Sequence, residues 1–393
     1  MRTAELPAPA PQALAASGRL FARITEAIAR EGGWIGFDRY MQLALYEPGL
    51  GYYSGGARKF GPQGDFVTAP ETSALFGACL AQQCVQWFDE AAPCVVEFGA
   101  GSGALAAQVL TELAALGVDG VGYRIVELSG ELRSRQRDTI RARAPQWADR
   151  VEWLERWPAS ISGVILGNEL LDAMPSRVFH LQAGVVLERG VGVDDGRLVW
   201  RDRAADPAFD REVRLVLREA WGDPQGWPDD YVSELCEQAP AWVREAARRL
   251  ERGAMLLIDY GFPRAEFYHP HRVSGTLMCH YRHFAHPDPF LHPGLQDITT
   301  HVDFSAIAQA AESSGLDCLG YTSQAHLLLN LGLLDRLSRT PAESAALYLP
   351  QSQAVQRMVS ESEMGELFKA IAFGRGVADD AAGFARGDRR GAL

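Results

Sequence analysis

The sequence predicts an α/β protein with a doubly wound parallel sheet, an N-terminal helical lid and a mid-chain insertion. Short apolar strands alternate with amphipathic helices from Cys94 onward, which is the rhythm of a parallel sheet covered by helices. A glycine-rich run at 99–103 separates a strand pattern from a helix pattern. The 393 residues, of which 47% are hydrophobic, exclude disorder over most of the length and allow one large domain or two ordinary ones.

The N-terminal region is expected to be helical after a mobile start. Residues 1–18 carry neither a secretory signal nor an Arg-rich transit peptide, so we expect a cytoplasmic protein. Residues 19–92 form the predicted helical and lid region. Within it, helix patterns cover 19–30, 37–47 and 72–90, and a glycine-rich passage at 49–71 reads as a loop that packs as a lid.

Residues 93–175 and 233–377 are predicted to form the doubly wound domain. In the first part, strands are expected at 94–99, 123–129, 151–157 and 161–169, with helices at 103–117 and 131–144. In the second part, we expect a helix over 233–253, a central strand at 254–261 and a helix opened by Asp303. These are followed by a strand at 316–324, a Leu-rich helix at 325–338 and, at 363–376, a helix that leads into a last strand.

Two segments interrupt or follow this pattern. Residues 176–232 are predicted to be an inserted region, which begins with a hairpin at 177–202 and faces the substrate. Residues 378–393 are polar and are expected to be a frayed tail.

Charge and cysteine content exclude several classes of protein. A net charge of −12 disfavours a surface that coats nucleic acid. No apolar run approaches the roughly 20 residues of a membrane-spanning helix. The six cysteines form no CxxC pair, so they are expected to be reduced thiols.

The strongest local motif is Glu97-Phe98-Gly99-Ala100-Gly101-Ser102-Gly103. Glycines at a turn between strand and helix let a ligand approach the backbone. Glu127, at the end of the next strand, can accept both hydroxyls of a ribose. The spacing GxGxG differs from the GxGxxG of dinucleotide-binding folds, and Glu97 can help to position a cationic group. The motif therefore favours S-adenosylmethionine over NAD and over a turn without a ligand.

Eight sequence blocks, in order, resemble the MidA-type family of class I S-adenosylmethionine-dependent methyltransferases: FDRYMQLALYEPGLGYY, GDFVTAPETSALFG, VVEFGAGSG, YRIVELS, GNELLDAMPSRVF, LLIDYG, DITTHVDF and MGELFKAIAFGRG. This resemblance covers nearly the whole chain. It implies a Rossmann-like, seven-stranded methyltransferase sheet. It also implies protein-arginine N-methylation, since the mitochondrial member of the family methylates an arginine in a core subunit of respiratory complex I. The oligomeric state stays open.

Other functions stay open beside this one. The acceptor could be a small molecule or another protein residue, or the chain could be a non-catalytic assembly chaperone that keeps the methyltransferase fold. The residues expected to contact the cofactor are Thr68, Pro70, Glu97, Gly99, Ala100, Gly101, Gly103, Glu127 and Asn168.

Four residues are candidates for the acceptor site: Glu169, Asp172, Asp259 and His301. Glu169 and Asp172 follow a strand and share a face if a helical turn begins there, so both could grip a guanidinium. Asp172 could instead cap a helix. Asp259 ends the next core strand. It either completes an acidic pocket or is a structural carboxylate whose hydrogen bonds are satisfied at the end of the strand. His301 could orient the acceptor or accept a proton.

Seven of the nine histidines fall between His269 and His301, a segment that is also rich in proline. None of their spacings matches a zinc signature, and no CxxC partner exists. We therefore expect no metal site and interpret the segment as a structured loop over the site.

Overall fold

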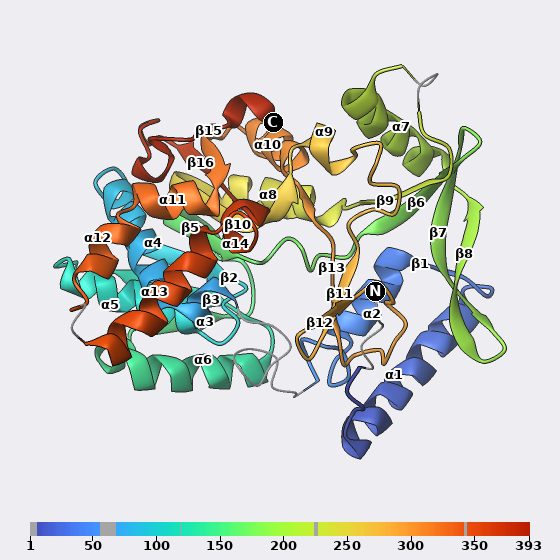
Figure 1. Ribbon diagram of the computed structural model, residues 1–393, viewed down its shortest axis with the longest axis horizontal. Helices are drawn as coiled ribbons and strands as arrows, with labels where there is room; N and C mark the ends of the chain where they lie inside the picture. The colour runs from blue at the N-terminus through green and yellow to red at the C-terminus, as the bar shows by residue number, and fades with distance from the viewer. Residues whose placement is uncertain (1–5, 56–67, 119, 224–226, 342–343) are drawn as a thin grey trace. The chain divides into compact units, whose positions relative to one another are not determined.

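The computed structural model describes residues 6–55, 68–118, 120–223, 227–341 and 344–393 (Figure 1). The chain divides into two compact units. The first unit consists of Met1–Phe66, Leu171–Ala239 and Phe262–Asp303, and the second consists of Val67–Leu170, Pro240–Gly261 and Phe304–Leu393.

The second unit is built on a mostly parallel sheet whose main path has seven strands in the order β15-β16-β10-β5-β2-β3-β4. Neighbours along β10-β5-β2-β3-β4 pair in parallel, whereas β16 is antiparallel to β10 and β15. The strands are β2 (Cys94–Phe98), β3 (Gly122–Val126), β4 (Val151–Leu154), β5 (Ile161–Asn168), β10 (Leu250–Phe262), β15 (Asp317–Ser323) and β16 (Phe368–Arg375). The expected α/β sheet is confirmed.

Helices cover both faces of this sheet, as a doubly wound fold requires. On one face, α4 and α5 contribute to a core with Val95, Tyr123 and Leu166. On the other face, the ring of Phe98 packs against Trp157 and against Trp242 of α8. The helices of this unit are α3 (Ala69–Thr72), α4 (Ala74–Phe88), α5 (Ala104–Ala115), α6 (Gly130–Arg143), α8 (Gln238–Arg249), α10 (Phe304–Glu312), α11 (Gln324–Asn330), α12 (Leu333–Ser338), α13 (Ala345–Val359) and α14 (Met364–Leu367), with short 3-10 turns at Pro145–Trp147, Ala382–Phe384 and Arg390–Ala392.

The first unit contains an antiparallel sheet in the order β1-β7-β6-β9, with β8 also paired to β7, and a small sheet in the order β12-β11-β13. Its strands are β1 (Ile35–Gly36), β6 (Arg177–Gln182), β7 (Val185–Asp194), β8 (Arg197–Ala204), β9 (Tyr231–Leu235), β11 (Met278–Tyr281), β12 (Phe284–His286), β13 (Asp297–Thr299) and β14 (Val302–Asp303). Its helices are α1 (Pro11–Arg30), α2 (Phe37–Tyr46), α7 (Pro207–Trp221) and α9 (Arg264–Phe267).

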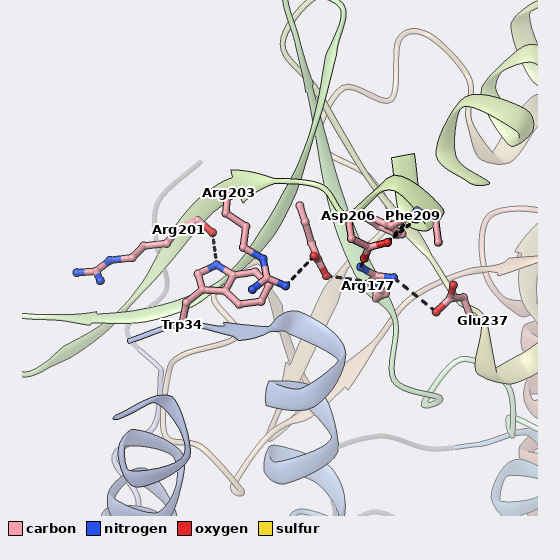
Figure 2. Close-up of polar contacts among 9 residues, drawn as sticks. Trp34, Arg177, Arg201, Arg203, Asp206, Phe209 and Glu237 are labelled. Carbon is pink, nitrogen blue, oxygen red and sulfur yellow. Dashed lines mark hydrogen bonds and ion pairs between the residues drawn. The ribbon is translucent and has the colours of Figure 1, made fainter. Parts of the chain in front are cut away.

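A network of hydrogen-bonded arginines and carboxylates connects several elements of the first unit (Figure 2). The buried carboxylate of Glu188 accepts hydrogen bonds from Arg177 Nε at 2.9 Å and from Arg203 Nη2 at 3.1 Å. The guanidinium of Arg203 also stacks over the ring of Trp34, at 3.3 Å from its centroid. Arg177 pairs with Asp206, which caps α7. This network therefore joins the segment before β1 to β6, β7, β8 and α7.

Several elements differ from the sequence-based expectation. The helix expected over 233–253 is instead β9, whose residues Tyr231–Leu235 pair with β6, followed by α8. The hairpin expected at 177–202 is a meander of three strands, β6, β7 and β8. The Leu-rich helix at 325–338 splits into α11 and α12 because Gly332 adopts a left-handed φ of 80°.

The two units also cut across the expected domain boundaries. Residues 262–303 belong with the N-terminal segment and the meander, since Cys279 and Ile298 pack with Tyr40 of α2. The tail at 378–393 differs from a frayed segment. Phe384 is buried, Arg389 N donates to the Tyr321 carbonyl, and Arg390 pairs with Asp379. No helix in the described ranges has the length and apolar character needed to cross a membrane.

Candidate functional site

The glycine turn lies between β2 and α5 in the second unit. Gly99, Gly101 and Gly103 all adopt left-handed φ angles, of 67°, 51° and 83°. A Cβ added at Gly103 would lie 2.9 Å from the Cα atom of Gln136, and one at Gly99 would lie 3.1 Å from Leu170. The backbone conformation therefore favours glycine at all three positions, and at Gly103 the packing against the backbone of Gln136 requires it as well.

Glu127 follows β3 at the same carboxyl edge of the sheet. Its Oε1 accepts a hydrogen bond from Ser129 N at 2.8 Å, and its Oε2 accepts one from Gln136 Nε2 at 3.2 Å. Burial raises the pKa of this carboxyl, and the hydrogen bonds from Ser129 and Gln136 oppose the rise. The next residue, Leu128, leaves 76% of its surface exposed, so an apolar surface lies beside this carboxylate.

Glu97 is buried inside the second unit, where it accepts a hydrogen bond from the hydroxyl of Tyr123 at 2.7 Å. Burial raises the pKa of Glu97 to about 7, while the bond from Tyr123 lowers it. The structure thus gives this residue a partner in the core. A contact of Glu97 with the cofactor stays a prediction.

The short helix α3 is held against the glycine turn. Gln108 of α5 donates from Nε2 to the carbonyl of Pro70 at 2.6 Å. Ser102, within the turn, donates to a carboxylate oxygen of Glu71. Thr68 and Pro70 therefore belong to a segment that is hydrogen-bonded to the glycine turn and to α5. The preceding part of the expected lid, 56–67, lies outside the described residues.

At the end of β5 the backbone makes an unusual turn. Glu169 has a left-handed φ of 51°, a conformation that costs energy for a residue with a side chain. Its backbone N donates to the carbonyl of Ile258, and the next amide, that of Leu170, donates to Asp259 Oδ2 at 3.0 Å. Asp259 therefore contributes to holding the turn that presents Glu169, and a catalytic role for Asp259 stays a prediction.

The side chain of Glu169 is oriented by two neutral donors. Oε1 accepts from Asn168 Nδ2 at 3.1 Å and Oε2 accepts from the hydroxyl of Tyr260 at 3.2 Å. The other amide atom of Asn168, Oδ1, is buried and accepts no hydrogen bond from the described residues. An acceptor of this kind suits a ligand that brings its own hydrogen-bond donor.

The remaining two candidates, Asp172 and His301, belong to the first unit. Asp172 is buried, and its carbonyl accepts from Thr300 N at 3.0 Å. No helix occurs between β5 and β6, all of whose residues are described, so Asp172 neither caps a helix nor shares a helical face with Glu169. His301 donates from its backbone N to Thr276 Oγ1 at 3.0 Å, and its ring stacks on Phe262. Catalytic roles for both stay predictions.

The residues described here include no group of three or more His, Cys, Asp or Glu side chains that could hold a metal ion. The histidine-rich segment, 269–301, contains the three strands of the small sheet, β11, β12 and β13.

Sequence reasoning missed three residues beside the glycine turn: Glu71, Ser102 and Gln136. Ser102 lies inside the glycine motif, and a hydroxyl at such a turn is a signal that could have prompted the search for a hydrogen-bond partner in another segment. Gln136 had a weaker signal, since it sits between Leu132 and Ile140 at four-residue spacing, on the buried face of α6. A polar residue on an otherwise apolar helix face needs a partner, and that was the available clue.

The second unit thus suits a ligand with ribose hydroxyls and a donor near Asn168. Comparison with known proteins agrees. The profile of a family described as "Putative S-adenosyl-L-methionine-dependent methyltransferase" matches residues 79–322. A crystal structure from Burkholderia thailandensis, bound to S-adenosyl-homocysteine, superposes with a TM-score of 0.93 at 51% identity and covers 99% of this chain and 100% of that one.

Curated relatives are more distant. The chain is 28% identical over 376 residues to the zebrafish (Danio rerio) protein named "Protein arginine methyltransferase NDUFAF7, mitochondrial", covering 86% of this chain and 82% of that protein. It is also 28% identical over 391 residues to the Drosophila melanogaster homologue of the same name, covering 88% of this chain and 82% of the relative.

Proposed function

This chain belongs to the family of S-adenosyl-L-methionine-dependent methyltransferases, and we propose that the group it methylates is an arginine side chain of a protein. The cofactor and the class of enzyme follow from the family and from the bound product in the Burkholderia structure. The arginine acceptor is supported by the names of the curated relatives and by the position of Glu169.

We assign the cofactor to the carboxyl edge of β2, β3 and β5. S-adenosylmethionine, when bound, supplies the reactive methyl group, so the protein needs to position and to shield more than to react. The glycine turn lets the backbone approach the ligand closely. Glu127 accepts hydrogen bonds from the ribose hydroxyls, and Asn168 Oδ1 accepts one from a donor of the ligand.

The observation that supports the acceptor is the geometry of Glu169. A strained, left-handed backbone and two neutral hydrogen bonds, from Asn168 and Tyr260, fix this carboxylate immediately beyond Asn168. A carboxylate so held can form charge-assisted hydrogen bonds to a guanidinium and fix the attacking nitrogen relative to the methyl group.

A core subunit of respiratory complex I is the acceptor implied by the family resemblance, and we propose it on that ground.

The test compares Glu169→Gln with Glu251→Gln. Glu251 is an exposed carboxylate near the amino end of β10, so its change matches the chemistry and lies at the opposite edge of the sheet. Each purified protein is incubated with methyl-labelled S-adenosylmethionine and a lysate of cells that lack the protein, and labelled methyl-arginine is measured after hydrolysis. A lost charge-assisted hydrogen bond of about 1.5–3 kcal/mol slows Glu169→Gln by about one to two orders of magnitude.

The control variant should label at the wild-type rate, and both variants should bind S-adenosyl-homocysteine normally in a calorimetric titration. Label on another residue type, or on small molecules, would contradict the arginine acceptor. Loss of cofactor binding by Glu169→Gln would instead place Glu169 in the cofactor site.

A further inference from the structure

Gln136 is a fully buried polar residue on an apolar helix face. Its exposed fraction is 0%, and the other buried residues of α6 are Leu132 and Ile140. A buried amide is costly unless its hydrogen-bonding groups find partners. The partners of Gln136 therefore indicate why this position tolerates a polar side chain.

The side-chain amide of Gln136 joins three other segments. Nε2 donates to the carbonyl of Gly101 at 3.2 Å and to Glu127 Oε2 at 3.2 Å. Oε1 accepts from the indole N–H of Trp153 at 3.0 Å. Because an indole nitrogen only donates, the amide oxygen must face Trp153, and the two amide hydrogens must face the carbonyl and the carboxylate. Both donors and the acceptor are thus satisfied in one orientation.

The backbone of α6 supports the same arrangement. A Cβ added at Gly103 would lie only 2.9 Å from the Cα atom of Gln136, so α6 packs directly on the glycine turn. The amide and the backbone of one residue together set the separation between the turn and the carboxylate of Glu127.

We propose that Gln136 is the positioning residue of the cofactor site, which holds the Glu127 carboxylate ionised and at a fixed place relative to the glycine turn. This proposal rests on the assignment of Glu127 to the ribose, made above, and it is independent of the methyl acceptor. Gln136 acts through Glu127 and Gly101, the two groups to which its amide donates.

The proposal predicts a pH effect with a definite sign. Burial raises the pKa of Glu127, and the donor of Gln136 opposes that rise because it stabilises the charged carboxylate. Without this donor the pKa of Glu127 rises further. An ionised carboxylate accepts hydrogen bonds from ribose hydroxyls more strongly than a protonated one, so the pH below which cofactor affinity declines should move upward.

The experiment is calorimetric titration of S-adenosyl-homocysteine into the full-length protein from about pH 5 to about pH 8. Gln136→Met keeps the size of the side chain and removes the amide. We expect the affinity to fall by about ten- to hundredfold, the loss typical of a hydrogen bond to a charged group. We also expect the decline at acidic pH to begin at a higher pH than in the wild type.

Gln324→Met is the matched control. Gln324 is also fully buried, and its amide donates to the Met358 carbonyl in a different part of the second unit. This variant should lose comparable stability with an unchanged pH profile. Glu127→Gln tests the premise separately. If it binds like the wild type, the ribose assignment is wrong. If it binds weakly while Gln136→Met binds like the wild type, the inference about Gln136 is wrong.

Gln136→Glu provides a second variant should Gln136→Met not fold. Its carboxylate would face that of Glu127, so the two would repel when both are ionised and would share a proton at lower pH. Affinity should then improve as the pH falls, opposite to Gln136→Met. A pH profile parallel to that of the wild type, in either variant, would overturn the proposal.

Discussion

Two glycines flank α5, and replacing each of them by alanine separates two free-energy costs, the strain of a left-handed backbone and the clash of an added methyl group. Gly103 precedes the helix with a φ of 83°, and Gly117 follows it with a φ of 79°. A Cβ at Gly103 would lie 2.9 Å from the Gln136 Cα atom, whereas beyond its chain neighbours no described atom lies within 4 Å of one at Gly117. Gly103→Ala and Gly117→Ala therefore share the backbone strain and differ in the clash.

The expected magnitudes follow from this difference. A left-handed backbone costs an alanine about 1–2 kcal/mol, which is the whole effect expected for Gly117→Ala. At Gly103 the added methyl group meets a backbone atom that cannot rotate away, and overpacking of this kind adds about 1–3 kcal/mol. Gly103→Ala should also push α6 outward and weaken the bond from Gln136 to the Gly101 carbonyl, so S-adenosyl-homocysteine should bind more weakly to this variant alone.

Hydrogen exchange of the backbone amides of α5 and α6 is the suitable assay, because the two units need not unfold together and exchange reports local stability. A calorimetric titration of S-adenosyl-homocysteine completes the comparison. Equal losses of protection in the two variants, with equal affinities, would refute the close packing of α6 on the turn.

Two further predictions concern buried carboxylates. Because the pKa of Glu97 in the folded protein is about 7, above its ordinary value of 4.5, the folded state holds this proton more tightly than the unfolded state does. The free energy of unfolding should therefore fall by at most about 3 kcal/mol as the pH rises from 4.5 to about 7. In a Glu97→Gln variant, the free energy of unfolding measured by denaturation should change less over this pH range. Glu188→Gln should destabilise the first unit by about 1.5 kcal/mol, the lower end for a hydrogen bond to a charged group, because Arg177 keeps its pair with Asp206 and Arg203 is half exposed. Unchanged exchange of the β6 and β7 amides in this variant would show that the network in Figure 2 is unimportant.

The strands and the glycine turn of the second unit were predictable because their signals are local. An apolar run such as Cys94–Phe98 and the left-handed φ angles of Gly99, Gly101 and Gly103 depend on neighbouring residues in the chain. The carboxyl edge of a parallel sheet then places Glu127 beside the turn, since β2 and β3 are adjacent. Sequence alone was therefore sufficient for the fold class and the cofactor.

The partners within the site depended on tertiary structure. Gln136 meets Gly101 across 35 residues of sequence and Ser102 meets Glu71 across 31, and neither spacing has a local signature. The backbone of Glu169 is held left-handed by a hydrogen bond to the neighbouring strand β10, and Tyr231–Leu235 became a strand because β6 was available to pair with it. Local pattern determines which elements can form, whereas hydrogen bonds and packing between distant segments determine which side chains meet and in what orientation.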